Sequence, residues 1–153
     1  MKPFRGIFAI PQTPFTAHGD PDEQALRRIV DFTIECGADG LVYPVNASEF
    51  NHLSDMERIQ LTRVVVEHTA GRIPMIAGVS GVSAEVASHL ASSAREVGAD
   101  ALIALPPYAR RAGLAEQVVF DYYQSIATAG RRRCEDSGYS YQVRIQHLLR
   151  QLF

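Results

Sequence analysis

The stretch GLVYPVNASEFNHLS, residues Gly40–Ser54, decides the fold of this chain. It opens with the apolar run Leu41–Tyr43, which is rich in strand formers and too short for a helix. The chain then turns at Pro44 into a polar loop, and Ser54–Glu57 shows the capping-box pattern that begins a helix. These residues predict one βα unit. In parallel α/β folds, ligands bind on the loop that leaves the carboxyl end of such a strand.

The same βα pattern is predicted four times along the chain. The expected strands are residues 8–11, 41–43, 74–77 and 101–105, and the expected helices lie within residues 22–37, 54–71, 83–98 and 114–129. The motif Gly37–Gly40 recurs as Gly98–Ala101, each time between the end of a helix and the start of a strand. The strand at 101–105 has no polar alternation, so we expect it to be the most clearly buried of the set.

The βα pattern ends at Gly130, where Arg131–Arg133 stand in place of a further strand. We expect this arginine run to be a solvated linker, because three clustered charges bind nucleic acid only weakly and in a salt-sensitive way. Apolar residues at helical spacing near the end of the chain predict a short amphipathic helix. The sequence is therefore divided into residues 1–130 and an arginine-rich tail, residues 131–153.

The composition is that of a globular protein. The 153 residues are 46% hydrophobic and 21% charged, with a formal net charge of −2, which gives no reason to expect a nucleic acid or an anionic membrane as partner. No apolar run approaches the ~20 residues that span a bilayer. Cys36 and Cys134 fit neither a metal-ligand spacing nor a disulfide framework. We expect a soluble cytoplasmic domain.

Three other patterns have a functional and a structural interpretation. His52 near Glu49 suggests a metal pair or an acid/base couple, but no third ligand is spaced with them, which favours a solvated loop histidine and no metal. Gly78–Gly81 resembles an anion cradle, although a tight βα turn is favoured. The helix after Ser54 carries the apolar residues Met56, Ile59, Val64 and Val65. A second apolar set at helical spacing is interpreted as a helix face for the core rather than as a cofactor site: Val118, Tyr122, Tyr123 and Ile126.

Four βα units fit either half of a (β/α)₈ barrel or a small doubly wound sheet. Short motifs favour the barrel: Thr13–Phe15, Gly37–Leu41, Glu49, Leu53–Ser54, Glu57–Arg58, Pro74–Val79, Gly98–Ala101 and Pro107–Tyr108. In this order and spacing, residues 4–129 resemble the amino-terminal half of the dihydrodipicolinate synthase / N-acetylneuraminate lyase family of class I aldolases. The resemblance implies an α/β fold, a partial TIM barrel of about four βα units over residues 1–130, with residues 131–153 outside the family pattern.

The resemblance also implies a chemistry. In the family, a lysine on the sixth strand forms a Schiff base with a 2-keto acid such as pyruvate, and the imine lets a carbon–carbon bond form or break without a cofactor. The loop after the second strand binds the substrate carboxylate and maps to Val45–Glu49. The substrate-binding residues implied here are Asn46, Ala47, Ser48 and Tyr108. Ala47 lacks the hydroxyl of the family loop, which favours a keto-acid aldolase or dehydratase ancestry over the synthase reaction.

The amine that the family reaction needs is missing from its expected place. Lys2 is the only lysine, and it precedes the first strand, where an amine stays solvated and protonated. An imine-forming lysine needs a lowered pKa. We therefore expect a truncated family member that has no catalytic residues of its own and is inactive. The alternative is a non-enzymatic half-barrel that binds a small carboxylate and pairs with a second copy, or with another chain, through its open sheet edges.

Overall fold

The computed structural model describes residues 4–107 and 115–131, in which strands and helices alternate. The strands are β1 (Phe8–Ala9), β2 (Gly40–Tyr43), β3 (Met75–Gly78) and β4 (Ala101–Ile103). The helices are α1 (Glu23–Glu35), α2 (Asp55–Thr69), α3 (Ala84–Val97) and α4 (Glu116–Ala129). Two 3₁₀ turns, η1 (Asn46–Ser48) and η2 (Phe50–His52), join β2 to α2.

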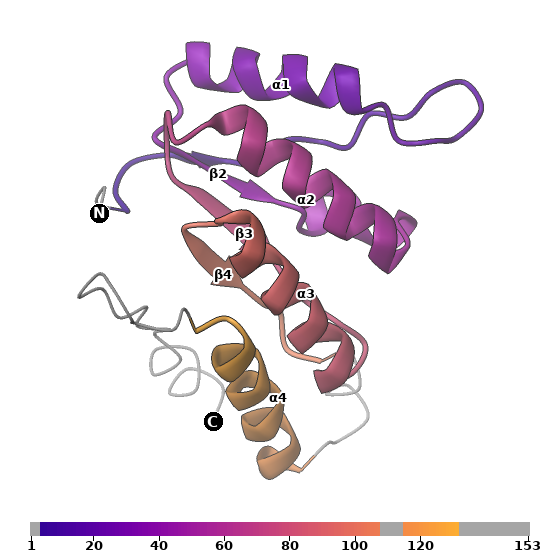
Figure 1. Ribbon diagram of the computed structural model, residues 1–153, viewed down its shortest axis with the longest axis vertical. Helices are drawn as coiled ribbons and strands as arrows, with labels where there is room; N and C mark the ends of the chain where they lie inside the picture. Colours follow the sequence, from indigo (N-terminus) through magenta and orange to yellow (C-terminus); the bar gives the residue numbers. More distant parts are fainter. Residues whose placement is uncertain (1–3, 108–114, 132–153) are drawn as a thin grey trace.

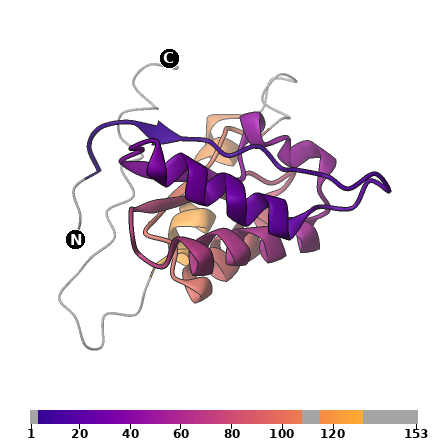
Figure 2. The same cartoon turned by 90° about the horizontal axis from the view of Figure 1, so that it is seen from above.

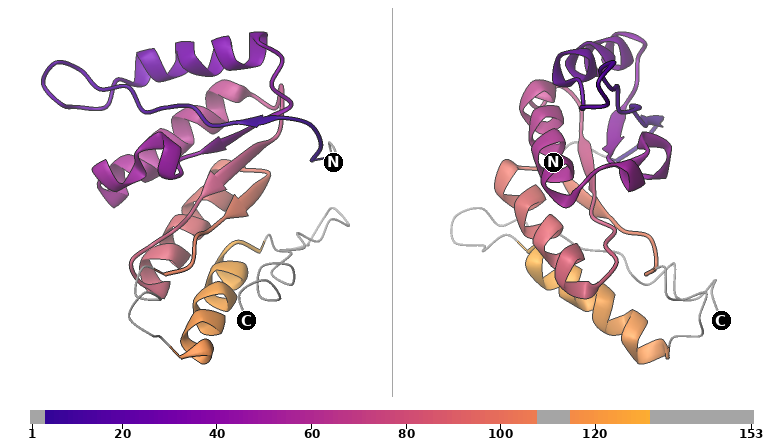
Figure 3. Two further views of the ribbon diagram at one scale, coloured as in Figure 1. Left: turned by 180° about the vertical axis from the view of Figure 1, so that it is seen from behind. Right: turned by 90° about the vertical axis from the view of Figure 1, so that its right-hand side faces the viewer.

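The strands form one parallel sheet in the order β1-β2-β3-β4. Figures 1 and 3 show the four helices side by side along one face of this sheet, each next to the helix that follows it in the chain. Figure 2 shows the β1–α1 connection running beside α1 and turning back at its far end. The predicted α/β fold with repeated βα units is confirmed.

Short polar side chains begin three of the helices, as the sequence predicts. Asp22 accepts a hydrogen bond from the Ala25 amide (2.8 Å) at the start of α1. Ser83 accepts from the Val86 amide (3.2 Å) at the start of α3. The capping box of α2 is complete: the Ser54 amide donates to the Glu57 carboxylate (2.7 Å), and the Glu57 amide donates to the Ser54 hydroxyl. The start of α2, just after the predicted substrate loop, is thereby fixed.

The core lies between the sheet and its helices. It is built from alternate residues of the two central strands and from the inward stripes of the helices, chiefly Leu41, Tyr43, Met75, Ala77, Leu26, Val30, Leu61, Val65, Leu90, Ala94, Tyr122 and Ile126. All four residues of β2, an inner strand of the sheet, are buried.

Three expectations about burial are wrong. The last strand was expected to be the most clearly buried, but β4 is an edge strand of the described sheet, and Ile103 is 44% exposed. It also ends at Ile103, before the predicted end at residue 105. Met56 in the first turn of α2 is 72% exposed, and Val118 is 47% exposed while Val119 takes the buried position. In α2 and α4, therefore, the first residue of the predicted apolar set stays outside the core, whereas Val65 and Ile126 lie within it.

The tail at residues 132–153 and Tyr108 lie outside the described residues, so the predictions made for them stay predictions. Within the described parts of the chain, no helix is both long and apolar enough to cross a membrane.

Candidate substrate-binding site

The predicted substrate loop is a compact turn at the carboxyl end of β2. The Ser48 amide donates to the Val45 carbonyl (2.8 Å), and the Glu49 amide donates to the Asn46 carbonyl (2.9 Å). Glu49, the residue between η1 and η2, adopts a left-handed backbone conformation (φ 61°). The loop therefore closes on itself through its last two amides.

A close backbone contact places this loop against the neighbouring strand. Gly78, at the carboxyl end of β3, packs so tightly against Pro44 that a Cβ atom at residue 78 would collide with the Pro44 carbonyl oxygen. A side chain cannot be accommodated there, which is the physical reason for glycine at this position. The loops after β2 and β3 consequently lie together at one edge of the sheet.

A buried chain of hydroxyl groups lies under the loop. The Thr13 hydroxyl donates to the Ser48 carbonyl oxygen (2.7 Å) and is 2.8 Å from the Tyr43 hydroxyl. Thr13 is 6% exposed and Tyr43 is fully buried. Burial raises the pKa of Tyr43 to about 12, and the hydrogen bond with Thr13 offsets only part of that effect. The Tyr43 phenol is therefore neutral at physiological pH.

The residues predicted to bind substrate differ in their exposure. Asn46 and Ala47 are exposed on the turn, whereas Ser48 is fully buried. The Ser48 hydroxyl has no hydrogen-bond partner within the described residues, and it is the Ser48 carbonyl that is anchored, by Thr13. The turn thus presents Asn46 and Ala47 outward and is held from inside at Ser48.

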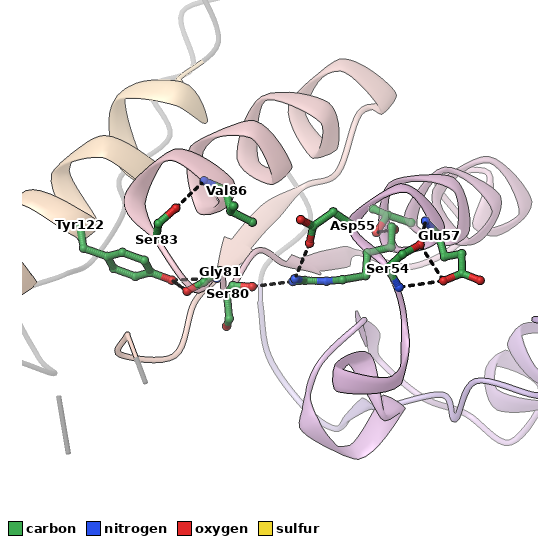
Figure 4. Close-up of polar contacts among 10 residues, drawn as sticks. Ser54, Asp55, Glu57, Ser80, Gly81, Ser83, Val86 and Tyr122 are labelled. Carbon is green, nitrogen blue, oxygen red and sulfur yellow. Dashed lines mark hydrogen bonds and ion pairs between the residues drawn. The ribbon is translucent and has the colours of Figure 1, made fainter. Parts of the chain in front are cut away.

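Between β3 and α3, polar groups of Ser80 and Gly81 are hydrogen-bonded to other parts of the protein (Figure 4). The Arg58 guanidinium donates to the Ser80 carbonyl (2.7 Å). The Tyr122 hydroxyl accepts from the Gly81 amide (3.0 Å) and donates to the Gly81 carbonyl (3.3 Å). The Ser80 hydroxyl accepts from the Leu105 amide (2.8 Å). These contacts favour the tight βα turn over the anion cradle.

Arg58 connects the two loops. Its guanidinium lies over the Phe50 ring of η2, 4.7 Å from the ring centroid, and its salt bridge to Asp55 measures 3.6 Å. The side chain is only 6% exposed. A charge this deeply placed needs such partners, because burial without them is costly. Arg58 therefore fastens the segment after the substrate loop to the β3–α3 turn.

Sequence reasoning assigned no role to three residues that organise this region: Thr13, Tyr43 and Tyr122. Thr13 was noted only as part of a family motif, Tyr43 only as a strand residue and Tyr122 only as a core aromatic. The available signal was chemical, since a buried hydroxyl usually has a hydrogen-bond partner. The partners of these three hydroxyl groups could not be assigned without the fold.

The pair His52 and Glu49 does not form a metal site in the structure. Both residues are exposed, and a backbone hydrogen bond joins them, from the His52 amide to the Glu49 carbonyl (2.9 Å). Across residues 4–107 and 115–131, no group of three or more histidine, cysteine, aspartate or glutamate side chains is arranged to hold a metal ion.

Comparison with known sequences identifies the family. Residues 3–132 match the profile of the dihydrodipicolinate synthetase family. The chain belongs to this family. Among its relatives is the L-2-keto-3-deoxyarabonate dehydratase of Azospirillum brasilense, 37% identical over 126 residues, or 82% of this chain and 41% of that protein. The 4-hydroxy-tetrahydrodipicolinate synthase of Herminiimonas arsenicoxydans is 38% identical over 117 residues, or 76% of this chain and 39% of that protein.

Solved structures of the dihydrodipicolinate synthetase family have the same arrangement of strands and helices. A prophage protein of Escherichia coli K12, solved in complex with pyruvate, matches with a TM-score of 0.77 and 29% identity over 82% of this chain and 42% of its own. The N-acetylneuraminate lyase of Mycoplasma synoviae matches with a TM-score of 0.77 and 30% identity over 82% of this chain and 43% of its own. The predicted partial TIM barrel is confirmed, and the chain spans about 40% of the length of these relatives.

Proposed function

We propose that residues 4–131 form the carboxylate-binding half of an active site for a 2-keto acid such as pyruvate, in a lyase of the dihydrodipicolinate synthetase family that acts through a Schiff base. The observation that carries the proposal is the turn Asn46–Ser48 at the carboxyl end of β2, which exposes Asn46 and Ala47. It stands where the family resemblance puts the carboxylate loop, and a related protein was solved with pyruvate bound.

The hydrogen bonds within the turn limit which of its amides can donate to a substrate carboxylate. The amides of Ser48 and Glu49 are used inside the turn, which leaves the amides of Asn46 and Ala47 as the backbone donors for a carboxylate. The Asn46 side-chain amide is exposed and adds a further donor. Hydrogen bonds to an ionised carboxylate are stronger than those between neutral groups, so two or three donors suffice to orient a small keto acid.

The absence of a hydroxyl group at Ala47 helps to choose between the reactions of the family. Ala47 cannot relay a proton, unlike the hydroxyl residue that the family resemblance puts at this position. We therefore favour a keto-acid aldolase or dehydratase reaction over the synthase condensation, in keeping with the relatedness to a keto-deoxy sugar acid dehydratase.

The covalent step needs an amine from elsewhere. Lys2 is the only lysine of the 153 residues, and it precedes the family match, which begins at residue 3. An amine becomes nucleophilic when burial or a neighbouring cation lowers its pKa. We propose that these 153 residues bind a keto acid reversibly and do not form an imine with it.

Two readouts on the 153-residue chain test this proposal. Saturation-transfer NMR is expected to show bound pyruvate, and Asn46→Ala is expected to weaken that binding. Asn51→Ala, the same change at an exposed residue of η2, is the matched control and is expected to leave binding unchanged. Borohydride reduction with pyruvate followed by mass spectrometry is expected to give no adduct. Lack of pyruvate binding, or a stable adduct, would contradict the proposal.

A second candidate is a non-enzymatic half-barrel that associates with a second copy, because both edges of the described sheet expose apolar side chains. Ile7, just before β1, is 73% exposed, and Ile103 of β4 is 44% exposed. Open parallel edges of this kind favour association. Size-exclusion chromatography with light scattering is expected to give a discrete dimer that Ile103→Lys dissociates. A monomer would contradict this candidate, and an aggregate would indicate edges that lack a defined pairing.

A further inference from the structure

We propose that Thr13 and Tyr43 are positioning residues that hold the keto-acid-binding turn through a directed chain of hydrogen bonds, running from the Tyr43 hydroxyl to Thr13 and from Thr13 to the Ser48 carbonyl. This inference rests on the proposed function, because the turn that it positions is the proposed carboxylate site. Neither side chain has to touch the substrate.

The direction of these hydrogen bonds follows from counting the hydroxyl protons of Thr13 and Tyr43. The Ser48 carbonyl oxygen can only accept, so the single hydroxyl proton of Thr13 must point to it across the 2.7 Å contact. Thr13 then has only lone pairs to offer at its other contact. The Tyr43 hydroxyl, 2.8 Å away, must therefore be the donor. Each of the two hydroxyl protons has one assigned acceptor.

Burial stabilises these two hydrogen bonds. Tyr43 is fully buried and Thr13 is 6% exposed, so water has little access to either contact. Burial also keeps the Tyr43 phenol protonated, with a pKa of about 12, so it remains a donor throughout the physiological range. A buried hydroxyl that loses its partner carries a larger cost than an exposed one, which disfavours alternative rotamers of both side chains.

The hydrogen-bond chain connects two segments that are distant in sequence, since Thr13 lies 30 residues before Tyr43 and 35 before Ser48. Thr13 lies in the β1–α1 connection, Tyr43 ends β2, and Ser48 ends η1. The anchored atom belongs to the backbone of the turn, so the bond fixes the turn itself rather than one side chain. Loss of the bond frees the Ser48 carbonyl and, with it, the orientation of the preceding amides of Asn46 and Ala47.

Three substitutions and one control test the inference on the full chain. Thr13→Val keeps the shape of the side chain and removes both bonds, Thr13→Ser restores the hydroxyl, and Tyr43→Phe removes only the first donor. Thr16→Val is the control, because Thr16 lies in the same connection, is exposed, and accepts from the His18 amide. The readouts are the pyruvate Kd, the ¹⁵N–¹H signals of residues 45–49, and unfolding by urea.

Thr13→Val is expected to weaken pyruvate binding about five- to tenfold and to shift the amide signals of the turn, as the loss of one well-made hydrogen bond implies. Thr13→Ser is expected to be close to wild type. Tyr43→Phe is expected to cost about twofold, because Thr13 still donates to Ser48. The control is expected to change neither readout. If Thr13→Val does not fold, Thr13→Ala takes its place, since it adds no bulk.

Two results would overturn the inference. One is a Thr13→Val protein that loses stability in urea while its pyruvate Kd and its turn signals stay at wild-type values, since the hydroxyls would then serve the core alone. The other is a Tyr43→Phe effect as large as that of Thr13→Val, which would show that the bond from Thr13 to the Ser48 carbonyl does not by itself hold the turn. If the wild-type chain binds no pyruvate, the proposed function fails, and the amide signals still decide whether Thr13 positions the turn.

Discussion

The loops after β2 and β3 lie side by side at the same edge of the sheet, yet they are built in opposite ways. The β3–α3 turn has its polar groups bonded to side chains from α2 and α4, through Arg58 and Tyr122. The β2 loop is anchored from below, at the Ser48 carbonyl, and its exposed part carries Asn46 and Ala47. The β3–α3 turn thus links α2 and α4, whereas the β2 loop is held from inside and leaves Asn46 and Ala47 exposed to solvent. Substitutions in each should therefore have different consequences.

The largest effect on stability is expected from Arg58→Ala, which removes the contacts of Arg58 with the β3–α3 turn and with η2. The change removes the 2.7 Å bond to the Ser80 carbonyl and the stacking on Phe50, and a loss of about 3 kcal/mol in the free energy of unfolding is expected. Urea denaturation measures it. Arg63→Ala, an exposed arginine of the same helix, is the matched control and is expected to change stability by less than about 0.5 kcal/mol. Equal effects would show that Arg58 does not fasten the two loops.

A smaller effect is expected from Tyr122→Phe. The ring stays in the core, but the bonds to the amide and carbonyl of Gly81 (3.0 and 3.3 Å) are lost. A loss of about 1–2 kcal/mol is expected, because a buried amide loses its partner. The pyruvate Kd of the folded protein is expected to stay within about twofold of wild type. A large loss of pyruvate binding with intact stability would instead place the β3–α3 turn in the binding site.

The smallest effect concerns the capping box where the β2 loop enters α2. Bonds from the hydroxyl and the amide of Ser54 hold the pKa of Glu57 below its ordinary value. A lowered folded-state pKa stabilises the protein above the ordinary glutamate pKa, and this contribution disappears as the pH falls through the lower value. Glu57→Gln is expected to flatten the decline in stability on acidification. Parallel stability curves for the two proteins between neutral and acidic pH would contradict this.

Much of the fold was predictable because its signals are local. Asp22, Ser54 and Ser83 begin helices as expected, since an N-cap depends only on residues a few positions away. The burial of β4 was predicted wrongly for a non-local reason: an apolar run does not reveal whether a strand has one neighbour or two. Edge position belongs to the sheet and not to the segment.

In the candidate site too, local features could be predicted from the sequence and contacts between distant residues could not. The position of the loop at a strand end follows from a motif and a βα pattern. The contacts of Thr13 with Tyr43 and Ser48 join residues 30 and 35 positions apart. No periodicity links such residues, so only the folded structure could bring them together. Tyr108, predicted from the family motif, remains a prediction.

The most direct test of the central claim is a pyruvate titration of the 153-residue chain followed by ¹⁵N–¹H NMR, with each loop as the reference for the other. If the β2 loop binds the keto-acid carboxylate, the amide signals of Asn46 and Ala47 should move in a saturable way and return on dialysis. Those of Ser80 and Gly81 should move far less. Shifts confined to the β3–α3 turn, or no saturable shift in either loop, would contradict the account.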